Sequence, residues 1–163
     1  MASSGLSNPP EGFREGRVRS GIGTGAGGGD AIARALEQYK RLAVVGLSSK
    51  PSRPSHGVAA YMKSQGYRII PVNPHETSVL GEKACASLDH VPFPLEIVVI
   101  FRKAAHVTDV VASAIRRGAK VIWMQEGIVN EEAARRAQEA GLMVIQDRCI
   151  LKEHARRFVT EGI

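Results

Sequence analysis

The sequence predicts an α/β protein built on a mainly parallel sheet of five strands. Short apolar runs rich in β-branched residues alternate along the chain with segments of helical periodicity. The runs are apolar almost throughout, which is typical of strands covered by helices on both faces of a sheet. The length of 163 residues suits one domain.

The first 29 residues differ in composition from the rest. The segment "SGIGTGAGGG" is of low complexity and cannot bury a core. Arg14, Arg17 and Arg19 give it a faint likeness to a transit peptide, which Glu11 and Glu15 weaken, and it lacks the apolar stretch of a secretory signal. We expect residues 1–29 to form a disordered tail or an expression remnant, and residues 30–163 to form the domain.

The first half of the domain contains two helices and three strands by pattern. Asp30 is a good N-cap for a helix, and "LAVVG" is a buried strand. A helix from about His56 is stopped by Gly66, and the strand "YRIIPVNP" follows. The stretch from 75 to 94 lacks a helical pattern and is predicted to be a long connection before the strand "LEIVVIF".

The second half repeats the alternation. An apolar stripe predicts a helix that ends at Gly118, followed by the strand "AKVIWMQ". Asn130 is expected to cap the next helix, which Gly141 ends. The last strand is "LMVIQDR", and residues 152–159 are predicted to form a closing helix.

The charge balance and the cysteine count narrow the classes of function. There are 22 Lys and Arg against 16 Asp and Glu, a net charge of +6. This excess is compatible with a well-solvated surface, nucleic acid, an anionic membrane surface or a phosphorylated small molecule. Few aromatic residues and no basic stripe rank nucleic acid last, and no apolar run is long enough to span a membrane. Two distant cysteines without metal-ligand spacing suggest a reducing, cytoplasmic setting.

The loop after the first strand has the composition of an anion site. Gly46 permits a tight turn, and the following helix would bring its N-terminus to the same place. Two prolines, Pro51 and Pro54, stiffen the loop and lower the entropy lost on binding. Hydroxyl and cationic donors come from Ser48, Ser49, Ser52, Ser55, Lys50 and Arg53. The alternative is an ordinary polar connection in which Ser55 only caps the helix.

A dinucleotide is the first candidate ligand for such a loop, and two features argue against it. The fingerprint G-x-G-x-x-G is absent. The second strand ends at Asn73 without the carboxylate that would bind the ribose of NAD. A P-loop is excluded by its missing motif. An adenine nucleotide with an extra phosphate and a long arm remains compatible with the loop.

Five motifs in series resemble the stand-alone coenzyme A-binding domain proteins. They are the stretch from "VVGLSSKPSRPSHG" to "PVNP", then "VLGEKACASL", "IFRK", "GAKVIWMQEGI" and "DRCILKEH", between about Tyr39 and Phe158. The same family resembles the N-terminal domain of the succinyl-CoA synthetase alpha subunit. The resemblance implies a Rossmann-like, three-layer fold that binds CoA through its adenosine diphosphate end.

The resemblance also implies a set of binding residues at the strand ends. The loop contributes Gly46, Ser48, Ser49, Lys50, Arg53, Ser55 and His56. The end of the second strand contributes Val72, Asn73 and Pro74. The end of the third strand contributes Phe101 and Arg102, and the next helix contributes Val107. The turn after the fourth contributes Met124, Gln125 and Gly127. A guanidinium such as that of Arg102 can hold a phosphate through two hydrogen bonds.

Several of these residues also have plain structural explanations. Phe101 and Trp123 are more often core than ligand contacts, and His56 and His106 can serve their helix starts. Two positions depart from the family pattern. Glu126 stands where relatives are commonly apolar, and Val99 stands where relatives often carry an acid.

Catalytic chemistry has little support in the sequence, so we expect a binding module. No Ser–His–Asp arrangement or metal cluster is visible, and His154 is expected to be an ordinary helix residue. The resemblance to the synthetase implies that ligation needs a second domain that bears a phosphohistidine, and a partner subunit. Cys149 follows the last strand, and Arg148 beside it favours a thiolate, so we hypothesise a reversible mixed disulfide with the thiol of CoA. An inert buried cysteine is the alternative, and Cys85 is expected to be incidental.

The leading interpretation is a CoA or acyl-CoA binding protein with a regulatory, carrier or redox-sensing role. The alternative is a small NAD(P)-dependent oxidoreductase. The expected partner is the small molecule itself, without nucleic acid or membrane, and a homo-oligomer is compatible with the sequence.

Overall fold

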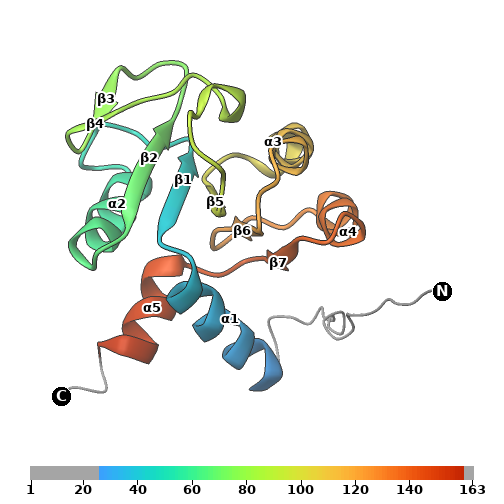
Figure 1. Ribbon diagram of the computed structural model, residues 1–163. Coiled ribbons are helices and arrows are strands. Elements are labelled where there is room, and N and C mark those ends of the chain that lie inside the picture. Colours follow the sequence, from blue (N-terminus) through green and yellow to red (C-terminus); the bar gives the residue numbers. More distant parts are fainter. Residues whose placement is uncertain (1–25, 160–163) are drawn as a thin grey trace.

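The structure is a computed structural model that describes residues 26–159. Its main sheet has five strands in the order β2-β1-β5-β6-β7. Figure 1 shows this sheet with its helices. The strands are β1 (Arg41–Val45), β2 (Arg68–Val72), β5 (Ile97–Ile100), β6 (Val121–Met124) and β7 (Met143–Ile145). The helices are α1 (Ala26–Gln38), α2 (Pro54–Ser64), α3 (Ala104–Arg116), α4 (Glu131–Glu139) and α5 (Ile150–Phe158).

All neighbouring strands of the main sheet run parallel, which confirms the predicted α/β fold. Each buries nearly all of its residues, as the near-continuous apolar runs predicted. Parallel strands place all their carboxyl ends at one edge of the sheet. The loops that follow β1, β2, β5, β6 and β7 therefore share that edge.

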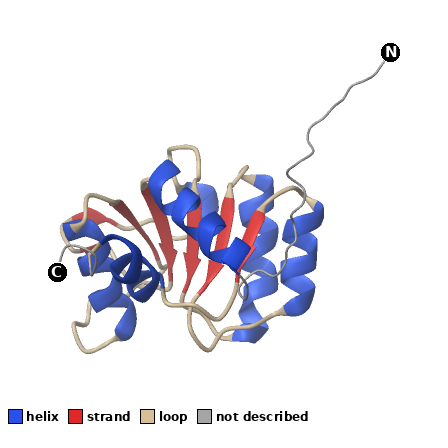
Figure 2. Cartoon of the chain, turned by 90° about the horizontal axis from the view of Figure 1, so that it is seen from below, coloured by secondary structure: helices blue, strands red, loops and turns tan. Residues whose placement is uncertain are grey.

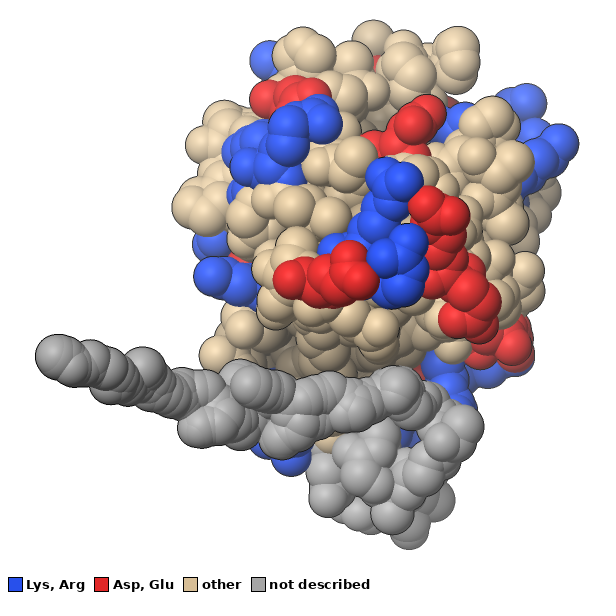
Figure 3. All heavy atoms as spheres, turned by 90° about the vertical axis from the view of Figure 1, so that its right-hand side faces the viewer, with Lys and Arg blue, Asp and Glu red and all other residues tan. Residues whose placement is uncertain are grey.

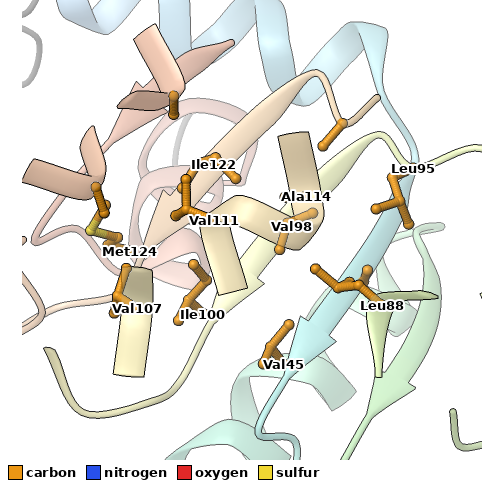
Figure 4. Close-up of a cluster of buried hydrophobic side chains, with 14 of the residues drawn as sticks. Val45, Leu88, Leu95, Val98, Ile100, Val107, Val111, Ala114, Ile122 and Met124 are labelled. Carbon is orange, nitrogen blue, oxygen red and sulfur yellow. The ribbon is translucent and has the colours of Figure 1, made fainter. Parts of the chain in front are cut away.

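Two apolar layers lie on opposite faces of the sheet, and Figure 2 shows helices on both sides of the strands. Alternate residues of β1 divide between the layers: Ala43 and Val45 belong to one, and Leu42 and Val44 belong to the other. The first layer includes the buried residues of α3 and α4. Figure 4 shows Val107 of α3 among the side chains of this layer. The second layer includes residues of α1, α2 and α5.

Two helix starts differ from the sequence prediction. Helix α1 begins at Ala26, so Asp30 lies inside it and is not its cap. Residues 26–29 therefore belong to a helix, while the disorder expected for residues 1–25 lies outside the described residues. Helix α2 begins at Pro54 rather than near His56, because proline suits the first turn, where its missing N–H has no helical partner.

The connection from 75 to 94 contains short elements that no periodicity could reveal. Strands β3 (Ser78–Val79) and β4 (Glu82–Lys83) form an antiparallel hairpin, and a single 3₁₀ turn, η3, spans Leu88–His90. The guanidinium of Arg117, at the end of α3, donates to backbone carbonyls within 88–93. These hydrogen bonds hold the connection against the end of α3, although the connection contains no α-helix.

The face that carries α3 and α4 is electrostatically mixed. Figure 3, which shows the right-hand side of Figure 1, has basic and acidic side chains interspersed. On α4, Arg135 pairs with Glu139 at 3.0 Å, and Arg136 pairs with Glu132 at 2.9 Å. Among residues 26–159, no helix is long and apolar enough to cross a membrane.

Candidate functional site

A crevice is expected between the carboxyl ends of β1 and β5, because the connections that follow these two strands run to opposite sides of the sheet. From β1, helix α2 packs on the second apolar layer and leads outward to β2. From β5, helix α3 packs on the first layer and leads the other way, to β6. Ligands of open α/β sheets bind at such a switch point, outside the strand carboxyl ends. The loops after β1 and β5 are therefore the core of the candidate site.

Gly46 brings these two loops into direct contact. Its backbone has φ +89°, a conformation that favours glycine. A Cβ at this position would lie 2.5 Å from the carbonyl oxygen of Phe101 and 3.1 Å from Cδ of Arg102. The tight turn expected from the sequence is therefore also a close approach between backbones, and it places Arg102 beside the loop after β1.

Two serines organise the loop by accepting backbone hydrogen bonds. The Oγ of Ser55 accepts from the N–H of Ser48 at 3.1 Å, and the Oγ of Ser48 accepts from the N–H of Lys50 at 3.0 Å. Ser55 therefore supports the loop and does not cap α2, whose N-cap is Arg53 without a side-chain bond. Because each hydroxyl oxygen accepts, its proton remains available to donate to a ligand.

Ser49 makes a different contact, which the sequence did not reveal. Its N–H and its hydroxyl both donate to Oε2 of Glu76, at 2.9 and 3.1 Å. The backbone bond, followed by the hydroxyl bond, holds the pKa of Glu76 below its usual value. A carboxylate thus lies at the loop, four residues after the end of β2. The expectation that no carboxylate lies nearby was therefore wrong, although this carboxylate is bound to Ser49 of the loop after β1.

Asn73 ties the end of β2 to the loop after β1. Its Nδ2 donates to the carbonyl of Leu47 at 3.0 Å, and its Oδ1 accepts from the N–H of His75 at 2.9 Å. Pro74 beside it is exposed. The side chain of Asn73 therefore fixes the geometry of the site, and both of its polar atoms are already engaged.

Three cations of the site have no counter-charge within bonding distance. In the described part of the chain, the side chains of Lys50, Arg53 and Arg102 make no hydrogen bond or salt bridge, although most arginines elsewhere do. Lys50 and Arg53 are exposed, and Arg102 is half-buried against Gly46. Unpaired cations around a stiff loop and a helix N-terminus suit an anionic ligand. His56, half-buried in the first turn of α2, lies next to this group in sequence.

Other residues in the predicted set belong to the apolar layers. Val72, Val107 and Met124 are at most 3% exposed, so their side chains serve the core. Phe101 is partly buried against the second layer, and its carbonyl faces Gly46. Trp123 is fully buried and donates from Nε1 to the carbonyl of Arg148 at 2.8 Å, a packing role as expected. Val99, where relatives often carry an acid, is also core.

The loop after β6 is held to its neighbours by polar side chains. Gln125 is buried and accepts from the N–H of Ile150, the first residue of α5, at 3.0 Å. The N–H of Gly127 donates to Oδ1 of Asp147 at 2.7 Å. The carboxylate of Glu126 pairs with Lys152 at 3.0 Å, so the acid at this departure from the family pattern is neutralised by a partner.

Cys149 is the N-cap residue of α5 and is only 9% exposed. It makes no side-chain capping bond, and it lies at the same sheet edge as the loop after β1. The guanidinium of Arg148, the residue predicted to favour its thiolate, lies 3.5 Å from the carboxylate of Glu153. Cys85 is partly buried beside the first layer, and both cysteines are free.

His154 lies in α5, away from solvent, and packs edge-on against Tyr61 and Tyr67. Its Nδ1 is 2.9 Å from the hydroxyl of Tyr61. Burial, assisted by the charge of Lys40, lowers the pKa of His154. Glu153 beside it is also buried, which opposes ionisation, but nearby guanidiniums outweigh that and lower its pKa. His154 is thus a packed helix residue, as expected. Within residues 26–159 no group of three or more His, Cys, Asp or Glu residues is placed to hold a metal ion.

A family model matches residues 40–155, and its description is "CoA binding domain". The matched range contains the loop after β1, Asn73, Arg102, Gln125 and Cys149. The chain is 44% identical over 124 residues to the uncharacterized protein YneT of Bacillus subtilis, a match that covers 76% of this chain and 92% of that protein.

The chain is also similar to a solved structure and to a subunit of a larger enzyme. A solved structure of a hypothetical protein from Pyrococcus horikoshii superposes with a TM-score of 0.77 at 40% identity, over 78% of this chain and 90% of that one. The alpha subunit of ADP-forming acetate–CoA ligase II of Pyrococcus furiosus is 28% identical over 127 residues. That match covers 70% of this chain but only 28% of the ligase subunit.

Proposed function

Because the chain belongs to the CoA-binding domain family, we propose that it binds coenzyme A or an acyl-CoA at the carboxyl ends of its parallel strands. The observation that carries this proposal is the contact at Gly46, which places Arg102 beside the loop after β1. That loop carries the cations Lys50 and Arg53 and leads into the N-terminus of α2. Such a group matches the several phosphates of CoA better than it matches an uncharged ligand.

The order of the strands suggests how the ligand is laid out. The diphosphate would lie against the loop after β1, with the adenosine toward Asn73 at the end of β2. The pantetheine arm would then cross the ends of β5 and β6 toward β7. Three strand spacings separate β1 from β7, about 14 Å, a span that a long flexible arm suits better than a compact nucleotide does. Gln125 and Cys149 would lie near the thiol end.

We propose that the protein holds CoA without catalysing its ligation. The ligase relative contains the matching segment as 28% of its length, so ligation there draws on much more protein. A regulatory, carrier or sensing role is consistent with binding alone. The cytoplasmic setting, a homo-oligomeric state and the absence of a nucleic-acid partner stay predictions.

The direct test is a crystal structure of the protein as purified, inspected for a ligand carried over from the cell. We expect CoA, with its diphosphate against residues 46–56 and its arm toward β7. NAD or NADP in the same crevice would support the oxidoreductase alternative instead.

A redox role at Cys149 is the more specific part of the proposal. Its thiol stands at the N-terminus of α5, a position that suits negative charge, without a capping bond to give up. The thiolate would attack one sulfur of CoA disulfide. The disulfide bond of that molecule would break, a Cys149–CoA disulfide would form, and the second CoA would leave as its thiolate.

Intact-protein mass spectrometry after incubation with CoA disulfide tests this step. We expect the wild type and Cys85→Ser to gain the mass of one CoA, reversibly with dithiothreitol, and Cys149→Ser to gain none. Equal labelling of Cys149→Ser, or no labelling of the wild type, would show that Cys149 is an inert buried cysteine.

A further inference from the structure

The carboxylate of Glu76 occupies part of the loop that the proposed function assigns to phosphate. One of its oxygens, Oε2, accepts both donors that Ser49 has, the backbone N–H and the hydroxyl. Ser49 comes directly after Ser48, whose hydroxyl organises the loop. An anion is therefore bound at this point of the loop already, and it is supplied by the chain itself.

A carboxylate oxygen and a phosphate oxygen accept hydrogen bonds from the same kinds of donor. Both are anionic acceptors that form short, charge-assisted bonds to backbone N–H and hydroxyl groups. Ser49 has one N–H and one hydroxyl proton, and both already point to Glu76. A ligand phosphate that approaches Ser49 thus meets occupied donors and a like charge. It can use Ser49 only after Glu76 has moved.

The attachment of Glu76 allows such a movement. Its carboxylate makes no salt bridge with any residue of the described chain, and the nearby charges that act on it are those of Lys50 and His75. The backbone is held separately, because the N–H of Glu76 donates to the carbonyl of Asn73 at 3.2 Å. The hairpin formed by β3 and β4 begins after it. A rotation of the Glu76 side chain would release Ser49 without unfolding a strand.

We propose that Glu76 is an internal competitor, which holds the Ser49 donors in the ligand-free protein and is displaced by a phosphate group of the ligand. This inference rests on the proposed CoA site and names a device that regulates it. The displacing group is a phosphate oxygen of either the 3′-phosphate or the diphosphate. The free energy needed to displace Glu76 lowers the affinity of the site for the ligand. The contact between Glu76 and Ser49 keeps the loop ordered when no ligand is bound.

Calorimetric titration with CoA and with dephospho-CoA tests the competition. Glu76→Gln keeps the shape of the side chain and removes its charge, and Glu76→Ala removes the contact. Both should bind CoA about three- to tenfold more tightly than the wild type, as expected when a charged hydrogen-bond acceptor stops competing. A gain for CoA alone would identify the 3′-phosphate as the displacing group, and an equal gain for dephospho-CoA would identify the diphosphate.

Glu82→Gln is the matched control, because it removes the same charge from the same connection. Glu82 pairs with Lys63 at 3.1 Å, and among the described residues no hydrogen bond or salt bridge joins its side chain to the loop. Its affinity should equal that of the wild type. An equal gain in Glu82→Gln would reduce the effect to net charge and overturn the proposal. So would unchanged or weaker binding by both Glu76 variants, which would make Glu76 a support of the loop.

The backbone amide of Ser49 gives a readout that does not depend on CoA. In ¹H–¹⁵N NMR spectra, inorganic pyrophosphate should shift this amide at a lower concentration in Glu76→Gln than in the wild type. Equal concentrations in both would contradict the competition. If no variant binds CoA while the pyrophosphate result holds, then the proposed function fails and the competition at Ser49 stands.

Discussion

The backbone carbonyl of Phe101 packs directly against Gly46, so that a Cβ at position 46 would lie 2.5 Å from the oxygen. The two residues stand at the ends of neighbouring strands β1 and β5, where the N–H of Phe101 donates to the carbonyl of Val45 at 2.9 Å. The contact brings the loops after these strands together. The close approach of these two loops therefore requires glycine, which has no side chain, at position 46.

Gly46→Ala should destabilise the protein and disrupt the site. The substitution combines a left-handed backbone with a collision against backbone, which cannot move as a side chain can, and we expect a loss of about 2 kcal/mol or more in the free energy of unfolding. Urea denaturation measures it. Gly57→Ala is the control, since Gly57 lies inside α2 with nothing within 4 Å of its Cβ position. That change should be neutral or stabilising, and a similar loss in both variants would contradict the argument.

Lys50 and Arg53 of the loop should bind the 3′-phosphate of CoA. Lys50→Ala with Arg53→Ala should weaken CoA by about tenfold or more, the usual scale for charge-assisted contacts, and should weaken dephospho-CoA much less. Calorimetry on both ligands measures the difference. Equal losses would remove any role in reading the 3′-phosphate and leave contact with the diphosphate.

A second double variant controls for net charge in that experiment. Lys120 precedes β6 at the opposite edge of the sheet, and Arg135 lies on the exposed face of α4. Lys120→Ala with Arg135→Ala removes the same two charges away from the loop. Its affinity for CoA should stay within about twofold of the wild type at physiological salt, because exposed charges beyond a Debye length are screened.

Asp147 should hold the loop after β6 through its side chain. It adopts φ +57° and accepts the N–H of Gly127 at 2.7 Å. Asp147→Ala should cost about 1–2 kcal/mol, since alanine tolerates this backbone poorly and cannot accept the bond. Asp147→Asn keeps both properties and should unfold at nearly the wild-type urea concentration. Equal losses in the two variants would assign the effect to the negative charge.

His154 should make stability depend on pH in a defined window. Burial, with Lys40 contributing, lowers its pKa below 6.5. Below about pH 6.5 His154 is protonated in the unfolded chain but stays neutral in the folded protein. The free energy of unfolding therefore falls as the pH drops from about 6.5 toward the folded pKa. Urea denaturation at several pH values should show a flatter profile between about pH 7.5 and 5.5 for His154→Asn.

The matched variant for this pH profile is His90→Asn, at an exposed histidine of η3. It should retain the wild-type slope, and an unchanged slope in His154→Asn would show that His154 accepts a proton in the folded state. Glu153 acts in a separate window. Its pKa is lowered from 4.5, so its contribution is lost only as the pH falls below that value.

The sheet and its helices were readable from the sequence because each carries a local pattern. Apolar runs predicted the five strands of the main sheet, and the cap at Asn130 is confirmed by the bond that its side chain accepts from the N–H of Ala133. The start of α1 was wrong because a good capping residue, Asp30, also lies well inside a helix. Strands β3 and β4 have two residues each, too few to show any periodicity.

The polar contacts of the site could not be read in the same way. Glu76 reaches Ser49 across 27 positions in sequence, and Asp147 reaches Gly127 across 20. Both contacts depend on the path of a loop, which carries no periodic signal. Asn73 was selected by resemblance, and only the structure shows that its side chain ties β2 to Leu47.

Calorimetric titration of the purified protein with CoA, acetyl-CoA, NAD and NADP tests the central claim most directly. The account predicts saturable one-to-one binding of CoA or acetyl-CoA, and no measurable heat from NAD or NADP at the same concentrations. Binding of NAD or NADP without binding of either CoA compound would contradict it.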